Sequence, residues 1–210
     1  MTYFKFSAVG SLPLGDNFVT SFHVSSNSPL TTVDIACRGA WDTFWNAIAQ
    51  YLPTATQLLE LNTVQLDSTN GKQAFSIANP ASIPGTGTAP DVSQQCAILV
   101  SLRTASAAKS GRGRQYLPAP VVAATSSNGA LSTAARDAID TAYGAMVTSI
   151  NTSHSFVILH GGFHRNADGS TEHRPLTSDP VTEVKVRNVL ATQRRRTNRA
   201  LVQYSNFRIA

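Results

Sequence analysis

The chain has few charged residues, since Asp, Glu, Lys and Arg occupy 14% of its 210 positions against a typical share of about 25%. Serine and threonine are abundant instead, with 22 of each. Sparse charge and many small hydroxyls are typical of surfaces that lie against other protein, because the centres of interfaces are depleted of charged residues. They are equally typical of a β-rich protein with many Ser/Thr turns, so composition leaves both interpretations open.

Cysteine and long apolar runs are also scarce. The two cysteines, Cys37 and Cys96, are too few for a disulfide framework, and their apolar neighbours predict free, buried thiols. No run of 18 apolar residues occurs, so the sequence predicts no contact with a membrane. The N-terminal residues 1–6 lack the apolar segment of a secretory signal, which predicts synthesis in a reducing cytoplasm.

Signatures of catalysis are missing too. No G-x-S-x-G motif marks a nucleophilic serine, and no carboxylates are paired for acid–base chemistry. The Gly- and Arg-rich residues 109–116 lack the G-x-x-x-x-G-K-[ST] spacing of a phosphate loop. The sequence therefore predicts a protein that is not an enzyme and needs no cofactor.

Three histidines and an aspartate lie close together at His160, His164, Asp168 and His173. If a hairpin turns near Asp168, His164 and His173 could face each other as metal ligands. No cysteine and no helical H-x-x-x-H pair accompanies them, so polar hairpin side chains are the favoured interpretation. We expect no metal site.

Apolar periodicity predicts two helices, over about 39–52 and 133–150. The first carries an aromatic stripe, interpreted as core, and Pro53 ends it. In the second, Ser132 or Thr133 can cap the first turn, and Arg136 with Asp140 forms an i,i+4 pair.

Alternating or apolar segments predict strands over about 2–9, 17–25, 56–66, 72–77, 95–104, 115–117, 155–160 and 181–187. Asn70-Gly71 and Asp168-Gly169 indicate hairpin turns, and the apolar run within 95–104 suggests a strand buried on both faces. In 181–187 the alternation places Glu183, Lys185 and Arg187 on the polar face. Strands and helices do not alternate regularly, so we expect one α+β domain over 1–210, with antiparallel sheets packed by the two helices.

Positive charge is concentrated in the second half of the chain. Residues 1–100 hold three Lys or Arg against six Asp or Glu, whereas residues 101–210 hold fourteen against six. This asymmetry favours either head-to-tail self-association or the binding of an anion. For self-association, carboxylates of the first half would meet the basic half of a neighbour, and the candidates are Asp34, Asp42, Glu60, Asp67 and Asp91.

The basic residues near the C-terminus are almost all arginines. Residues 184–210 carry seven basic side chains and no acidic one, and no lysine follows Lys185. Arginine offers a planar fork of donors to carboxylates or phosphates, so this choice indicates contacts of fixed geometry, although a solvated run of charges is a further interpretation. The residues expected at a subunit interface or anion-binding surface are Lys109, Arg112, Arg114, Arg187, Arg194, Arg195, Arg196 and Arg199.

Several segments, in order, resemble a poorly characterised family from tailed bacteriophages and environmental viral genomes, whose members are generally regarded as virion components. The most specific are Ser-Gly-Arg-Gly-Arg-Gln-Tyr-Leu-Pro at 110–118 and Thr-Gln-Arg-Arg-Arg at 192–196; residues 39–44, 97–103, 134–146 and 184–191 add to the resemblance. Members often have Asp where this chain has Ala191, so any pairing made by that aspartate is not expected here. The family offers no catalytic residues to transfer.

The resemblance implies a virion structural protein made in the host cytoplasm. We expect a tail or head–tail junction subunit that forms homo-oligomeric rings or tubes and contacts other virion proteins. The alternative is a capsid or DNA-proximal protein whose arginines bind packaged nucleic acid. A receptor-binding or decoration module is a third interpretation, and it would need an exposed, concave aromatic patch.

Overall fold

The computed structural model describes residues 2–11, 17–53, 56–66, 73–78, 95–96, 98–103, 114–118, 122–123, 131–158, 161–165, 167–168, 171–175, 181 and 183–188. Within them, a five-stranded antiparallel sheet has the order β4-β3-β1-β2-β9. Its strands are β1 (Thr2–Ser11), β2 (Asn17–Ser26), β3 (Gln57–Leu66), β4 (Gln73–Ala78) and β9 (Ser155–Val157). The predicted pairing of the segments near 56–66 and 72–77 is confirmed, while Asn70-Gly71 lies outside the described residues.

Helix α1 (Leu30–Ile48), continued by the short 3-10 helix η1 (Ala49–Tyr51), packs on this sheet. Alternate residues of β1 are buried, and Phe6 lies 5.9 Å from Trp41 between ring centroids. Trp45 is likewise stacked on Phe18 of β2 at 5.9 Å. The aromatic stripe is therefore core, as predicted.

The first helix begins at Leu30 rather than near residue 39. Pro29 precedes the first turn, where its missing N–H is not needed by the helix. Val33 and Cys37 extend the buried stripe one turn at a time towards the N-terminus. They lie among threonines and an aspartate, which is why the apolar signal of this first part was weak.

Helix α2 (Thr133–Asn151) packs against α1 through Tyr143, whose ring centroid is 4.1 Å from that of Phe44. The predicted cap is confirmed, because the Ser132 Oγ accepts a hydrogen bond from the Ala135 amide at 3.1 Å. Neither α1 nor α2 is long and apolar enough to cross a membrane, in the part of the chain that the structure describes.

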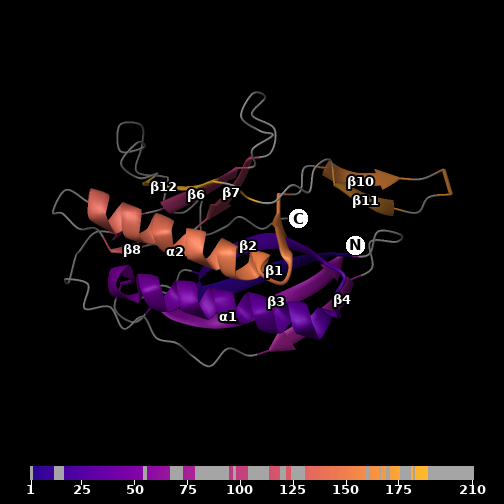
Figure 1. Ribbon diagram of the computed structural model, residues 1–210, viewed down its shortest axis with the longest axis horizontal. Coiled ribbons are helices and arrows are strands. Elements are labelled where there is room, and N and C mark those ends of the chain that lie inside the picture. The colour runs from indigo at the N-terminus through magenta and orange to yellow at the C-terminus, as the bar shows by residue number, and fades with distance from the viewer. Residues whose placement is uncertain are drawn as a thin grey trace.

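A second antiparallel sheet has the order β12-β6-β7 and consists of β12 (Glu183–Asn188), β6 (Ile98–Arg103) and β7 (Arg114–Pro118). In Figure 1, α2 lies between α1 and this sheet. The expectation that the strand within 95–104 is buried on both faces is wrong: Val100 and Leu102 are buried, but Ser101 and Arg103 are half-buried. One face of the sheet supplies core, since Val100, Leu102 and Leu117 are buried there, whereas Ser101 and Tyr116 on the other face are half-buried and exposed, respectively.

Two further ribbons pair β5 (Gln95–Cys96) with β8 (Val122–Ala123) and β10 (Gly161–Arg165) with β11 (Thr171–Pro175). One continuous core joins both larger sheets and both long helices, running from Phe4 to Val186. The α+β prediction, with antiparallel sheets packed by two helices, is confirmed. The single domain over 1–210 stays a prediction.

Candidate functional site

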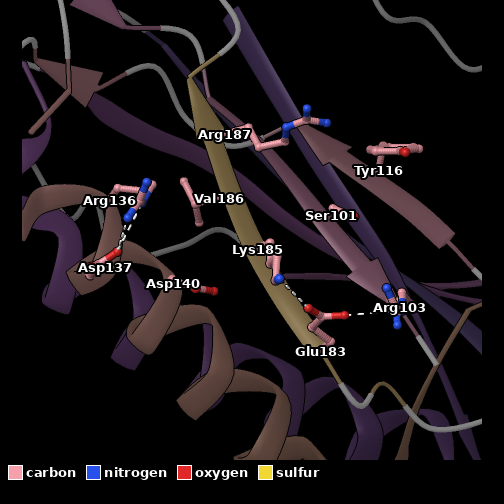
Figure 2. Close-up of a pocket in the computed structure, with 10 residues that line it drawn as sticks. All are labelled: Ser101, Arg103, Tyr116, Arg136, Asp137, Asp140, Glu183, Lys185, Val186 and Arg187. Atoms are coloured by element: carbon pink, nitrogen blue, oxygen red, sulfur yellow. Dashed lines mark hydrogen bonds and ion pairs between the residues drawn. The ribbon is translucent and has the colours of Figure 1, made fainter. Parts of the chain in front are cut away.

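A groove of about 430 Å³ lies between α2 and the outer face of the β12-β6-β7 sheet (Figure 2). The antiparallel register builds its floor, because Glu183 pairs with Arg103 and Lys185 with Ser101, while Ser101 also pairs with Tyr116. Residues paired across strands share a face of the sheet. The polar side chains that the sheet contributes are Ser101, Arg103, Tyr116, Glu183, Lys185 and Arg187.

The wall of the groove is one face of α2, which contributes Arg136, Asp137 and Asp140. Positions three and four apart lie together on a helix surface, so these side chains gather opposite β12. Helix α2 turns Ile139 and Tyr143 into the core, which leaves the polar residues on the groove side. These nine polar side chains of sheet and helix are called the charged groove below.

The expected pairing of Arg136 with Asp140 is not found. The Arg136 guanidinium instead bonds to the Asp137 carboxylate, with nitrogen–oxygen distances of 3.1 and 2.9 Å. The adjacent carboxylate lies within easy reach of both guanidinium nitrogens, whereas Asp140 points towards β12 in Figure 2. The helical spacing permitted the pair, but the nearer acceptor is used.

Both signs of charge are present in the charged groove. Four cationic side chains, Arg103, Arg136, Lys185 and Arg187, lie with three carboxylates. Glu183 accepts from Lys185 at 2.7 Å and from Arg103 at 3.3 Å. These pairs are exposed or half-exposed, and such pairs contribute only about 0–1 kcal/mol each. They can exchange partners with an incoming molecule at little cost.

Two charges of the groove have no ion-pair or hydrogen-bond partner among the described residues: Arg187 and Asp140. Partial burial raises the pKa of the Asp140 carboxyl, the Asp137 carboxylate raises it further, and Lys185 and Arg136 oppose the rise. An added cation would favour the ionised form of Asp140. The groove is therefore suited to a molecule that brings a cation to Asp140 and an anion to Arg187.

The predicted interface residues are described only in part. Arg187 lies on β12 in the charged groove, and Arg114 begins β7 with Arg103 as its cross-strand partner. The rest lie outside the described residues, namely Lys109, Arg112, Arg194, Arg195, Arg196 and Arg199.

Sequence reasoning did not select Arg103, Tyr116 or Asp140 as site residues. Arg103 ends an apolar run and Asp140 lies within a helical pattern, so neither had a local signal. Only the register of β6 with its two neighbours, and the packing of α2 on β12, bring these residues together.

One predicted interface carboxylate, Asp34, belongs to the interior. It is 5% exposed, and its two oxygens accept from the Thr63 hydroxyl at 2.6 Å and from the Arg38 Nε at 2.7 Å. This carboxylate links α1 to β3 and does not reach a neighbouring subunit. Asp42 and Glu60 are half-buried, and Asp67 and Asp91 lie outside the described residues.

The strand register does not place His164 and His173 opposite each other. The register of β10 with β11 places Glu172 opposite His164, and Phe163 opposite His173. No cluster of three His, Cys, Asp or Glu residues suited to a metal occurs among the residues that the structure describes.

The Cys37 thiol is free and fully buried, as predicted. Burial, helped by the nearby Asp34 carboxylate, raises its pKa to about 12. Because the thiolate is the reactive form of cysteine, this residue is structural. The side chain of Cys96 lies outside the described part of the chain.

Comparisons with protein-family models, with curated proteins and with solved structures each found no match to the chain. The function of the charged groove is therefore argued from its own side chains.

Proposed function

We propose that this chain is a bacteriophage virion structural subunit, located in the tail or at the head–tail junction, which assembles into rings or tubes through surfaces of opposite charge. The observation that carries the proposal is the charged groove, a surface that holds both cationic and anionic side chains and whose ion pairs are exposed or half-exposed. A surface of mixed charge is complementary to another protein, because each sign selects its opposite and so sets the register of the contact.

The aromatic content of the groove supports a protein partner. Tyr116 is 48% exposed on the outer face of β7, and tyrosine is enriched in protein interfaces. The charged groove also lies entirely within residues 101–210, the basic part of the chain. The resemblance of residues 110–118 and 192–196 to phage virion proteins supplies the virion context, with synthesis in the host cytoplasm and other virion proteins as further partners.

Self-assembly is tested by negative-stain electron microscopy and sedimentation velocity of the purified chain at low and high salt. Suitable concentrations are about 0.1 M and about 1 M, between which the Debye length shortens from about 10 Å to about 3 Å. We expect rings or tubes at low salt that dissociate at high salt. A neutral osmolyte at matched osmolality is the control, and monodisperse monomers at both salt concentrations would contradict the proposal.

A second candidate function is the binding of packaged nucleic acid, and the order of the basic segments along the chain, next to β7 and β12, favours it. Strands β7 and β12 both run antiparallel to β6, so they point in the same direction. The segment with Lys109 and Arg112 precedes the start of β7, and the arginines from Arg194 onwards follow the end of β12. The two basic segments therefore join the sheet at opposite ends, with Lys185 and Arg187 between them.

Nucleic-acid binding predicts a different response to salt. Each neutralised phosphate releases counterions, so the affinity for a fluorescein-labelled oligonucleotide would fall steeply with salt while the chain remained monomeric. Fluorescence polarisation with single-stranded and duplex DNA measures this affinity. Rings or tubes without DNA, together with a flat salt response of DNA binding, would exclude this second function.

A further inference from the structure

The charges left without partners in the charged groove are of opposite sign. Arg187 and Asp140 have no ion-pair partner among the described residues, while the other groove cations are held by Glu183 and Asp137. We propose that the charged groove binds the same groove of a second copy of this chain, with Arg187 of each copy paired to Asp140 of the other. This inference rests on the proposed function, because it specifies one of the contacts through which the subunit assembles.

Symmetry makes a second copy the occupant that fits. In a two-fold contact the same patch meets itself, so a residue i that touches j of the partner is matched by j touching i. A surface with one free cation and one free carboxylate thus supplies its own complement. The Arg187–Asp140 pair would therefore form twice in each dimer.

The cations whose charges act on Asp140 within the chain form their ion pairs with other carboxylates. The cations nearest to it electrostatically, Lys185 and Arg136, already pair with Glu183 at 2.7 Å and Asp137 at 2.9 Å. In Figure 2 the Asp140 carboxylate points across the groove towards β12, and Arg187 lies further along that strand, past Val186. The two free charges are therefore offset along the groove, as a two-fold contact between two copies requires.

A polyanion fits this groove less well. Phosphates would pair with Arg187 but would also approach the Asp137 and Asp140 carboxylates, and like charges at short range oppose binding. Tyr116 is exposed on the same face, and tyrosine is enriched in protein interfaces.

Charge reversal tests the contact on the full chain at about 0.1 M salt, where ion pairs are only partly screened. The variants are Arg187→Asp, Asp140→Arg and the two combined, and the self-association constant is measured by sedimentation equilibrium. Each single reversal should weaken self-association by roughly 100-fold or more, because the two-fold contact replaces the pair by like charges twice. The double variant should regain most of the lost affinity, since its reversed charges again meet opposite partners.

Matched controls are Thr148→Asp and Thr148→Arg, which place charge on an exposed position of α2 outside the charged groove. They should leave the association constant within about twofold of the unmodified chain, since their charges lie away from the contact. Circular dichroism melting of every variant separates loss of fold from loss of contact. Because Arg187 is exposed and Asp140 is only half-buried, we expect these variants to remain folded.

The outcomes separate the groove contact from the proposed function. Rings or tubes that persist unchanged in both single variants would refute the groove contact and leave the virion-subunit proposal standing. A chain that is monomeric before any substitution would refute both. The neutral variant Asp140→Asn distinguishes a second copy of the chain from a polyanion as the molecule that binds the groove. We expect it to weaken self-association. Unchanged self-association together with tighter binding of a 20-nucleotide DNA would overturn the inference.

Discussion

Replacement of Asp34 by alanine should cost far more stability than loss of a surface carboxylate. Asp34 is 5% exposed, and it joins α1 to β3 through the Thr63 hydroxyl at 2.6 Å and the Arg38 Nε at 2.7 Å. Arg38 also donates to the Leu61 carbonyl at 2.9 Å, so the guanidinium is held between helix and sheet. The side chain of Arg38 is only 15% exposed.

The magnitude follows from what the substitution leaves behind. Removing one partner of a buried ion pair costs about 3–5 kcal/mol, because the other charge stays in a poorly solvated site. The small remaining exposure of Arg38 and its bond to Leu61 lower that figure, whereas the fully buried Thr63 hydroxyl loses its acceptor and adds about 1 kcal/mol. We expect Asp34→Ala to reduce the free energy of unfolding by about 3–4 kcal/mol.

Urea denaturation followed by tryptophan fluorescence measures this loss, because Trp41 and Trp45 are both fully buried in the core. Asp137→Ala is the matched control: Asp137 also accepts from an arginine, at 2.9 Å, but its side chain is 61% exposed. Its loss should cost under about 1 kcal/mol. Equal costs for the two substitutions would refute the assignment of Asp34 to an internal link.

Three further substitutions test the core. Gly10→Ala should reduce the free energy of unfolding by about 1–3 kcal/mol, because an added Cβ would overlap the Phe18 ring. The loss would be measured as a lower urea midpoint, and an unchanged midpoint would mean that the ring moves aside at no cost. Tyr143→Phe should raise the melting temperature, since it removes a buried hydroxyl that has no hydrogen-bond partner among the described residues, and a lower temperature would reveal one. Burial lowers the pKa of His154 below 6.5, so the folded state favours the neutral imidazole. The contribution of His154 to stability is therefore fully present above about pH 6.5 and is lost as the pH falls through the lower pKa of the folded state. His154→Gln should flatten this part of the stability profile between about pH 5 and pH 7.5, and a variant as steep as the unmodified chain would place the proton uptake elsewhere.

Sequence patterns anticipated the elements whose burial follows a local period. The alternation over 181–187 correctly separated Val186, which is buried, from Lys185 and Arg187, which are exposed. The aromatic stripe around Trp41 and the cap at Ser132 were also recognised, because a helical face and a first-turn hydrogen bond depend on residues only a few positions apart.

The start of α1 and the burial of Asp34 did not follow from any local pattern. Asp34 resembles a surface carboxylate in sequence, and only the approach of Thr63 from β3 supplies the hydrogen bond that allows its burial. The same approach stabilises the first turns of α1, which begin at Leu30 with few apolar residues.

The sequence by itself determined the central turns of both helices, the strands of the two larger sheets, which face of β12 is polar, and that positive charge lies in the second half of the chain. Only the tertiary structure decided that Arg103, Tyr116 and Asp140 share one groove with Arg187, and that β9 completes a sheet begun by β1 and β2. The physical reason is that periodicity and capping act between neighbours along the chain. Strand order and the contacts between charges that are distant in sequence depend instead on which apolar faces bury one another. That arrangement is set by the packing of all core residues together.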